Sequence, residues 1–402
     1  MQGSNMAKFV HHRTLFAFAA LVSAGSARAQ DGLSVGTNGV IYKSNNFDLS
    51  VGGRFNLDGV HYDTGQSSGD NVRVRRARIE VAGKIAHFIK FRVDREFTQS
   101  SAQRASRSTQ IGGGWRNVWV AIEPTKHFAL KGGNFVVPFS MEELQNSNRS
   151  ALMERSDVSS LAPSYSLGAM LSYDNKHFTV SGGYFGKALD EDDSKSKGRG
   201  EGFAGRVTFA PVLGERTFVH LGAAYEQRDL KAGELLRFVA RSGSQFAPAL
   251  MSTGRLYAAK TRMLGAEAAY SVGPFLVQAQ YAQNHLERDL LANLDFSAWY
   301  AQAAFIVTGQ TYEYSKGSGT VGGVRIKKRG ALELAARVSG IDLRDGAVPA
   351  GIGRTYTGGV NYYMNRNVRF MVNYARSRAH RIQPLDTDRK DDLITGRFQL
   401  SF

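Results

Sequence analysis

Apolar and polar residues alternate along most of this chain, and the pattern is clearest between residues 47 and 97. From Leu49 to Leu57 every second residue is apolar or small, and the residues between them are polar, charged or glycine. The run from Ile89 to Asp94 alternates in the same way, with lysine, arginine and aspartate on its polar side. Because successive side chains of a strand point to opposite faces, this pattern predicts strands with one apolar and one charged face.

Roughly sixteen such segments follow one another, each about ten residues long, which is the length that a tilted strand needs to cross a hydrocarbon layer. They begin near Phe47, Val72, His87, Trp115, His127, Ser166, His177, Gly202, Arg216, Lys260, Pro274, Phe296, Gly330, Gly353, Asn367 and Leu393. The repetition predicts an all-β chain.

Short and long connections alternate between these segments, as in an antiparallel up-and-down barrel with tight turns at one rim and long loops at the other. The short ones are 83–86, 124–126, 174–176, 211–215, 271–273 and 364–366. The long ones are 64–71, 98–114, 136–165, 187–201, 228–259, 285–295, 343–352 and 377–392. One connection, 308–329, is long where the alternation calls for a short one.

A transmembrane β-barrel agrees with the hydropathy, since the mean is -0.29 and a barrel crosses the membrane on alternating strands of ordinary average hydropathy. The alternative is a soluble sandwich or propeller, but no internal repeat of propeller length is evident. The last segment alternates up to a terminal Phe402, a feature of outer-membrane barrels. Aromatic residues suited to a membrane-interface girdle are Tyr184, Tyr225, Tyr270, Tyr281, Trp299, Tyr362 and Tyr374.

The N-terminus reads as a secretory signal peptide over residues 1–29, followed by a barrel domain over 30–402. Lys8 belongs to a basic region, residues 15–22 are apolar, and residues 27–29 form a small-x-small cleavage site. The alternative is a buried N-terminal helix. The chain has no cysteine, which agrees with an oxidising compartment. These features predict the bacterial outer membrane as the location.

The formal net charge is +16, and residues 1–29 contribute three basic residues and no acid. A lysine or arginine facing the bilayer midplane costs about 2–4 kcal/mol, so the charged faces of the strands are expected to line a water-filled lumen. Basic residues assigned to this face are Arg54, Arg76, Arg78, Lys90, Arg92, Lys131, Arg206, Arg337, Arg369 and Arg397. The acids are Asp48, Asp58, Glu80, Asp94, Glu96, Glu226, Glu267 and Glu333.

Two consecutive arginines, Arg75 and Arg76, lie in the second strand, and simple alternation would point them to opposite faces. Arg76 shares the charged face, whereas Arg75 shares a face with Ala77 and Ile79. Both enter the lumen only if a β-bulge lies between them. Otherwise Arg75 faces the rim or a neighbouring subunit.

Residues 136–165 form a long loop with unusual apolar content, including Met141 and Leu152. We expect it to fold into the barrel and narrow it, presenting Arg149 and Arg155; the alternative is an extracellular flap. The other long loop, 228–259, carries basic residues that either extend a basic path upward or lie in an exposed cap. They are Arg237, Arg241 and Arg255.

Several motifs in order resemble the phosphate-selective porins O and P over nearly all of the chain after residue 29. They are VGGRFNLDG at 51–59, VRRARIEVAG at 74–83, the passage 115–143, ALMERS at 151–156, the passage 220–230 and the closing GRFQLSF. The resemblance implies a sixteen-stranded outer-membrane barrel, a homotrimer, an inward-folded third loop and a ladder of basic residues that guides anions.

Arg54, Arg75 and Arg76 lie at positions that look like ladder and central-site arginines of that family. In the loop, phosphate-selective members place lysine where this chain has Glu143 and Asn148, and Arg149 is near enough to compensate. The predicted anion-binding or pore-lining set is Arg54, Arg75, Arg76, Arg78, Lys90, Arg92, Lys131, Arg149 and Arg155.

These observations predict passive diffusion of small anions, inorganic phosphate or polyphosphate included, along a basic lumen embedded in outer-membrane lipid. Arginine suits phosphate because its planar fork donates two hydrogen bonds, and rings of Arg and Lys select anions. The alternative is a general, weakly selective porin. No cofactor and no metal site is expected.

Two other classes of function are weighed against this one. A GxSxG match, GLSVG at 32–36, would place a nucleophile at Ser34, but a nucleophile elbow needs a strand before it and a helix after it. We therefore expect no enzyme. Adhesion or nucleic-acid binding by a basic surface would need outward charges, whereas the alternation directs them inward.

Overall fold

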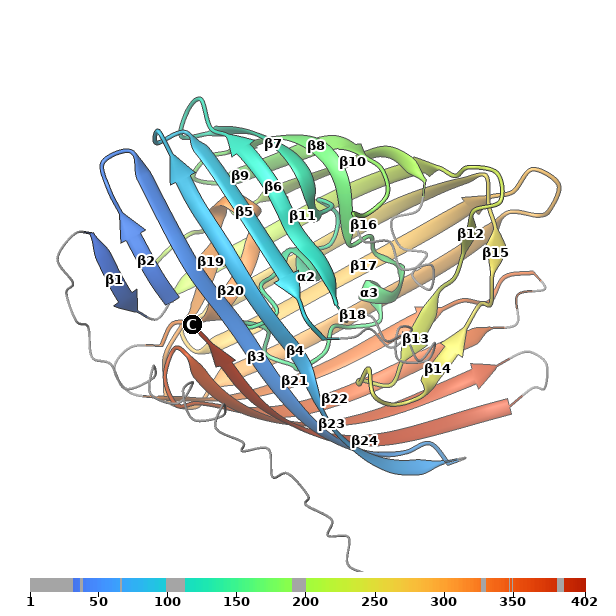
Figure 1. Ribbon diagram of the computed structural model, residues 1–402. Coiled ribbons are helices and arrows are strands. Elements are labelled where there is room, and N and C mark those ends of the chain that lie inside the picture. The colour runs from blue at the N-terminus through green and yellow to red at the C-terminus, as the bar shows by residue number, and fades with distance from the viewer. Residues whose placement is uncertain are drawn as a thin grey trace, which may run out of the picture.

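Sixteen strands close into a single antiparallel barrel (Figure 1). The computed structural model describes residues 32–402 except 37–38, 66, 99–112, 190–199, 327–329, 347, 349 and 382–386. The predicted signal segment 1–29 lies outside the described residues, as do most of two predicted long loops, 98–114 and 187–201. Among the described residues, no helix is long and apolar enough to span a membrane.

The wall strands run in chain order around the ring, each antiparallel to its neighbours. They are β3 (Phe47–Asp63), β4 (Ser68–Ile85), β5 (Ile89–Glu96), β6 (Gly114–Ile122), β7 (Phe128–Val136), β8 (Tyr165–Asp174), β9 (Phe178–Phe185), β10 (Glu201–Phe209), β11 (Thr217–Asp229), β16 (Lys260–Val272), β17 (Phe275–Glu287), β18 (Leu294–Ile306), β21 (Ala331–Asp342), β22 (Gly351–Tyr363), β23 (Val368–Arg381) and β24 (Thr387–Ser401). The ring closes where β24 pairs with β3. The predicted all-β, antiparallel up-and-down barrel of about sixteen strands is confirmed.

The two faces of each strand have the chemistry that the alternation predicts. In β17, for example, Gln278 and Gln280 are buried in the barrel, while Val277 and Tyr281 are exposed on its outer face. Six of the predicted girdle residues are exposed on the outer wall: Tyr184, Tyr225, Tyr270, Tyr281, Tyr362 and Tyr374. The outer wall is therefore an apolar band with aromatic residues, which is the surface that lipid chains require.

Strand starts agree with the sequence pattern except at the rim that carries the long loops. There β24 begins at Thr387 rather than near Leu393, and β4 begins at Ser68 rather than near Val72. The outer face of the early part of β24 carries Lys390 and Asp392, which lie opposite Arg378 and Arg376 of β23 in the strand register. An apolar alternation cannot reveal a strand end whose outer face is charged.

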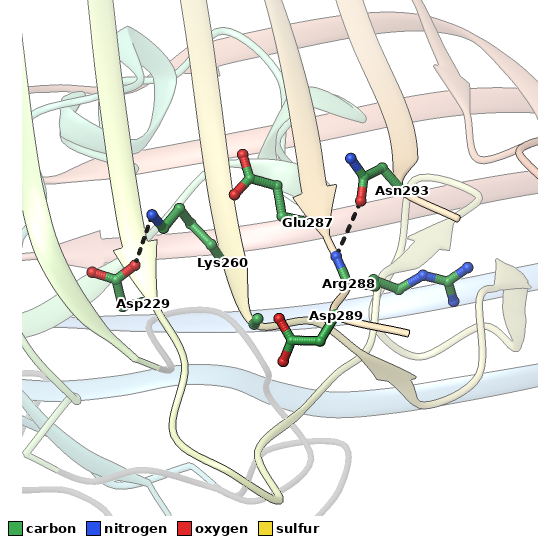
Figure 2. Close-up of a pocket in the computed structure, with 7 residues that line it drawn as sticks. Asp229, Lys260, Glu287, Arg288, Asp289 and Asn293 are labelled. Atoms are coloured by element: carbon green, nitrogen blue, oxygen red, sulfur yellow. Dashed lines mark hydrogen bonds and ion pairs between the residues drawn. The ribbon is translucent and has the colours of Figure 1, made fainter. Parts of the chain in front are cut away.

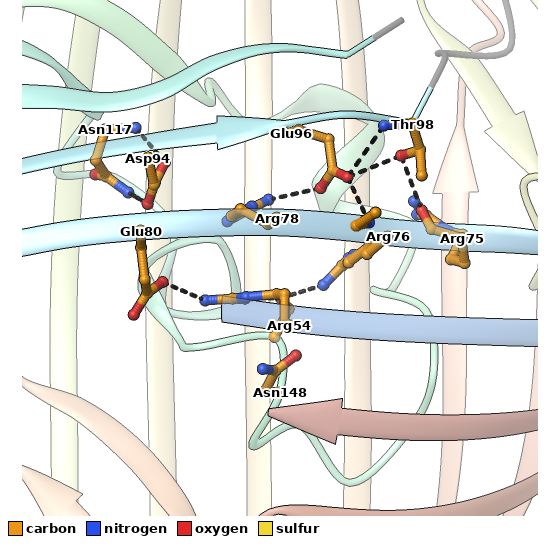
Figure 3. A network of polar contacts seen from close by, with 12 residues as sticks. Arg54, Arg75, Arg76, Arg78, Glu80, Asp94, Glu96, Thr98, Asn117 and Asn148 are labelled. Carbon is orange, nitrogen blue, oxygen red and sulfur yellow. Dashed lines mark hydrogen bonds and ion pairs between the residues drawn. The ribbon is translucent and has the colours of Figure 1, made fainter. Parts of the chain in front are cut away.

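A β-bulge lies in β4 at Arg75. Asn56 of β3 pairs with Arg76 and the next residue, Leu57, pairs with Val74, so Arg75 is the extra residue. Beyond the bulge the inward parity of β4 is restored, and both arginines reach groups inside the barrel (Figure 3).

Within the connection 308–329, residues 312–324 form a hairpin that packs inside the barrel at the short-turn rim. It contains β19 (Tyr312–Ser315), the 3-10 turn η2 (Lys316–Ser318) and β20 (Thr320–Val324). Thr179 of β9 donates to the carbonyl of Lys316 at 2.8 Å, and Arg206 of β10 donates to the carbonyl of Ser318 at 2.8 Å. Its length thus breaks the alternation because the segment fills part of the lumen instead of turning tightly.

A small hairpin, β1 (Leu33–Gly36) and β2 (Gly39–Lys43), extends the wall at the same rim. β24 ends at this rim, where the backbone of Phe402 forms hydrogen bonds with Gly53 of β3. Beyond that point β2 pairs with the same edge of β3, from Val51 back to Asp48. Ser34 lies in β1, and the segment after it is the strand β2. The GxSxG match therefore does not form a strand-turn-helix elbow.

The junction at Gly53 predicts a local test of barrel closure. A Cβ on Gly53 would lie 2.7 Å from the carbonyl oxygen of Arg78 and 2.8 Å from the Phe402 ring. We expect Gly53→Val to reduce the fraction of protein that shows the heat-modifiable, folded band on an SDS gel. Gly396→Val is the matched control, because no atom lies within 4 Å of its Cβ position. Equal folding of both variants would contradict the closure described here.

Candidate functional site

Residues 137–164 contact inward-facing side chains from several wall strands. The loop contains the short helices α2 (Met141–Leu144) and α3 (Val158–Leu161), which lie within the ring in Figure 1. Ser140 donates its hydroxyl to Gln280 of β17 at 3.1 Å. Ser339 of β21 donates to Asp157 at 2.7 Å. Hydrogen bonds on opposite parts of the loop thus fix it against the wall.

The apolar residues that distinguish this loop are its anchors. Phe139, Met141 and Val158 are fully buried, and Leu152 and Leu161 are nearly so. They pack against inward-facing apolar residues of the wall and of the second long loop. Burying a side chain of this size stabilises a fold by about 1.5–3 kcal/mol, so the loop has a defined position.

The second long loop also packs against the inner wall and forms two small hairpins. They pair β12 (Leu235–Leu236) with β15 (Leu256–Tyr257), and β13 (Val239–Arg241) with β14 (Ala249–Ser252). Arg389 of β24 donates to the carbonyl of Ala249 at 2.9 Å. The rings of Phe238 and Phe296 meet edge to face, with centroids 5.6 Å apart. Much of this loop is therefore buried, in contrast to a fully exposed cap.

Two arginines converge on one hydroxyl of the first loop. Arg54 of β3 donates to the Ser147 hydroxyl at 3.3 Å, and Arg76 of β4 donates to the same oxygen. Both side chains are more than nine-tenths buried. Arg54 also pairs with Glu80 at 3.2 Å. Within the described part of the chain, no carboxylate lies within ion-pair distance of Arg76 (Figure 3).

The bulged arginine next to this pair is neutralised. Arg75 donates two hydrogen bonds to Glu154 of the loop, at 2.8 and 2.9 Å. Arg397 of β24 shares that carboxylate at 3.0 Å and pairs with Asp58 at 2.7 Å. Arg75 therefore holds the loop to the wall and keeps its charge compensated.

Most of the remaining predicted cations also have carboxylate partners. Seven of the nine form ion pairs, and the exceptions are Arg76 and Lys131. The pairs not yet described are Arg78–Glu96, Lys90–Glu123, Arg92–Glu80, Arg92–Asp94, Arg149–Glu313 and Arg155–Glu143. Lys131 lies 4.6 Å from the Trp119 ring centre and 5.2 Å from that of Phe135.

The chain matches a known protein family and several solved structures. A family profile described as phosphate-selective porin O and P matches residues 46–402. The chain belongs to this family. It is similar to Porin O of Pseudomonas aeruginosa, with 24% identity over 432 residues that cover 96% of this chain and 95% of that protein. It is thus a porin of the bacterial outer membrane with a preference for anions.

Solved structures share the fold of this porin at low sequence identity. OmpF of Salmonella typhi, in complex with daunomycin, aligns with a TM-score of 0.56 and 14% identity, covering 90% of this chain and all of that one. An anion-selective porin from Comamonas acidovorans aligns with a TM-score of 0.55 and 12% identity, covering 89% of this chain and all of that one. In outer-membrane barrels the short turns generally face the periplasm and the long loops face the outside.

The sequence pattern misses some lumenal arginines, and one of them lies beside the loop of the candidate site. Arg116 of β6 stands 5.4 Å from the ring centre of Tyr165. Trp119 and Ala121 of the same strand face the lumen, so simple alternation would point Arg116 to the outside. A second register shift, opposite Asp94, turns it inward together with Asn117. As at Arg75, a bulge places two consecutive residues on the lumenal side.

The two loop positions that depart from the family pattern have different surroundings. Glu143 pairs with Arg155 at 3.1 Å. The carbonyl oxygen of Asn148 accepts hydrogen bonds from Arg369 and Gln399, whereas its buried side-chain oxygen has no partner. Asn148 therefore lies near Arg54 (Figure 3) and contacts Arg369, but it contributes no positive charge.

One loop carboxyl gives the porin a pH-dependent stability. Burial raises the pKa of Asp157 to about 6, with a smaller contribution from Glu142, against the opposing effects of the Ser339 hydrogen bond and Arg337. A pKa raised in the folded state means that the folded barrel binds this proton more tightly than the unfolded chain. This stabilisation is complete below the unfolded pKa near 4 and is lost as pH rises through about 6.

We therefore expect Asp157→Asn to unfold at a higher temperature than the parent at pH 7.5, and to lose this part of the pH dependence. The upper bound is on the order of 3 kcal/mol. The check is the heat-modifiable gel shift at pH 4.5 and 7.5, with the exposed turn substitution Glu215→Gln as control. A variant less stable than the parent at pH 7.5 would mean that the charged carboxylate supports the loop.

Proposed function

We propose that this porin carries small anions, inorganic phosphate among them, and that Arg54 and Arg76 form its selective site. The observation behind this proposal is the convergence of both guanidinium groups on the neutral Ser147 hydroxyl. Arg76 has no carboxylate within ion-pair distance among the described residues, and Arg54 shares Glu80 with Arg92. The site therefore has an excess of positive charge in a place where little water reaches.

Two converging guanidinium groups match the chemistry of a tetrahedral oxyanion. Each presents paired N–H donors that phosphate accepts bidentately. Their mutual repulsion in the free porin is relieved when an anion enters between them. An anion that passes must also leave, and the nearby carboxylates of Glu80 and Glu96 lower the local positive potential. This balance is what conduction through a binding site requires.

We propose that the loop over residues 136–165 narrows the channel at this site, since it supplies Ser147 and is held by Arg75 and Arg337. The ion-paired cations, among them Arg78, Arg92 and Lys90, would then provide a path of weaker sites toward the periplasmic turns. Their carboxylates reduce but do not abolish the attraction for a passing anion.

A general, weakly selective anion porin is the second candidate, and Glu143 and Asn148 favour it. These are the positions where the phosphate-selective pattern has lysine. Glu143 binds Arg155 and removes a charge from the loop, while Asn148 leaves the arginines without a further cationic neighbour. The two candidates differ in whether phosphate is held long enough to block the flow of chloride.

We also propose that residues 1–29 are removed as a signal peptide and that the porin assembles as a homotrimer. The order of basic, apolar and small residues supports the first. Support for the second comes from OmpT, an outer membrane protein of Vibrio cholerae described in trimer form. It aligns with a TM-score of 0.53 and 12% identity, covering 88% of this chain and all of that one. Neither an enzymatic role nor nucleic-acid binding gains support, because Ser34 lies in a hairpin and the cations of the candidate site face inward.

The arginine pair is tested with Arg76→Gln in single-channel recordings. Losing a hydrogen bond to a charged group weakens binding by about 1.5–3 kcal/mol, so we expect at least a roughly tenfold higher phosphate concentration for half-block of the chloride current. Lys90→Gln is the matched control, because it removes one lumenal charge that is already paired with Glu123. Equal changes in both variants would show that bulk lumen charge, rather than this pair, sets selectivity.

The general-porin alternative is tested by restoring a loop cation with Asn148→Lys. The new ammonium group would join Arg54 and Arg369 at the site, so we expect stronger phosphate block and a larger reversal potential toward the chloride limit. Ser150→Lys, two residues further along the same loop, serves as the control for added charge. No gain from Asn148→Lys would mean that this position does not face the anion path.

A further inference from the structure

A row of three unpaired cations lies on the outer face of the wall, near the extracellular rim. Cross-strand register places Arg354 of β22 directly opposite Arg378 of β23, and Arg378 directly opposite Lys390 of β24. All three residues are exposed. Directly opposed side chains of a sheet have Cβ atoms about 4.5–5.5 Å apart, and like charges so placed repel. The fold therefore holds three positive charges together at a cost in stability.

Nearby carboxylates compensate only part of the charge of this row, which we call the outer basic row (Arg354, Arg378 and Lys390). In the described part of the chain, none of the three forms a hydrogen bond or ion pair. Asp392, the adjacent acid, accepts two hydrogen bonds from Arg376, at 2.8 and 3.1 Å, and one from Tyr374. Asp392 also attracts Arg378 electrostatically, but its hydrogen bonds go to Arg376 and Tyr374.

Two further acids lie near the row, and in the described part of the chain neither forms an ion pair with a lysine or arginine. Asp388 on β24 faces His380 at 3.0 Å. On the neighbouring strand β3, Asp63 accepts a hydrogen bond from the backbone of Gly65. The row and Arg376 together hold four cations against the three acids Asp63, Asp388 and Asp392, so an excess of positive charge remains.

The row lies just beyond the aromatic girdle. Tyr356 is two residues below Arg354 on β22, and Tyr374 is four residues below Arg378 on β23; both rings are exposed on the outer wall. Two residues correspond to about 7 Å along a strand. Girdle aromatics mark the level where hydrocarbon ends and headgroups begin. The three cations therefore lie at headgroup height in the outer leaflet.

We propose that the outer basic row binds the phosphate groups of a phosphorylated outer-leaflet glycolipid, whose acyl chains lie against the apolar wall below. Charge complementarity and the position above the girdle identify this occupant. The same rim elsewhere has the opposite arrangement: in the region shown in Figure 2, Lys260 pairs with Asp229 at 3.5 Å. Arg262 pairs with Glu287. The unpaired row is thus not a general property of the rim.

The test uses the folded full-length porin in detergent and lipid A carrying both phosphates as the probe, with bound lipid counted by native mass spectrometry. The variant is Arg354→Gln/Arg378→Gln/Lys390→Gln. Each basic residue at a charged headgroup layer contributes roughly fivefold in affinity, so we expect about a hundredfold loss for the triple variant. The control, Lys260→Gln/Arg262→Gln/Arg344→Gln, removes three rim cations that have carboxylate partners.

The outcomes distinguish a bound glycolipid from free phosphate and from a second copy of the chain. Selective loss in the first variant, with dephosphorylated lipid A bound weakly by both proteins, supports the proposal. Equal loss in both variants, or none, overturns it. Complete competition by millimolar inorganic phosphate would assign the row to free phosphate, and a change of oligomeric state without a change in lipid would assign it to a second copy of the chain. If the triple variant does not fold, Arg378→Gln alone is measured, with a roughly fivefold loss expected.

Discussion

The structure depends on one constraint, namely that the hydrocarbon layer accepts apolar side chains and rejects unpaired charge and unpaired backbone. A closed ring of antiparallel strands satisfies every backbone group of the wall. The alternation of side chains then sends one face of each strand to lipid and the other to the lumen. A basic chain built in this way must concentrate its cations inside, where they repel one another unless carboxylates or anions lie between them.

The lumenal charges fix the loops as well as line the channel. Arg337 of β21 pairs with Glu142 at 3.1 Å, and Arg397 of β24 reaches Glu154 at 3.0 Å. Each of these pairs is buried, and removing one partner of a buried pair typically destabilises a fold by about 3–5 kcal/mol. Loop position and lumen electrostatics are therefore coupled. Among the described residues Arg76 has no carboxylate partner, and it meets Arg54 at the Ser147 hydroxyl.

Much of the architecture follows from the sequence, because apolar and polar residues alternate in every strand that has one face toward lipid. The strand starts, the inward charges and the outward tyrosines all come from that period. It fails where the period is interrupted. Arg75 is ambiguous and Arg116 is missed, since a bulge changes parity without a residue type that reveals it.

The partners inside the lumen are harder to predict than the faces. Alternation assigns Arg78 and Arg92 to the lumen, but whether each meets Glu80 or Glu96 depends on the register between strands. The hairpin within 308–329 is visible in the sequence only as a connection of unexpected length. Its contact with Arg206 arises from residues more than a hundred positions apart, and such contacts leave no local signal.

The central claim is that the lumen prefers anions and holds phosphate at an arginine pair. The most direct measurement is the reversal potential of the unmodified porin in a planar bilayer under a KCl gradient, followed by addition of phosphate. We predict a reversal potential on the chloride side and block of the chloride current by low concentrations of phosphate. A reversal potential on the potassium side, or the absence of any channel, would contradict the account.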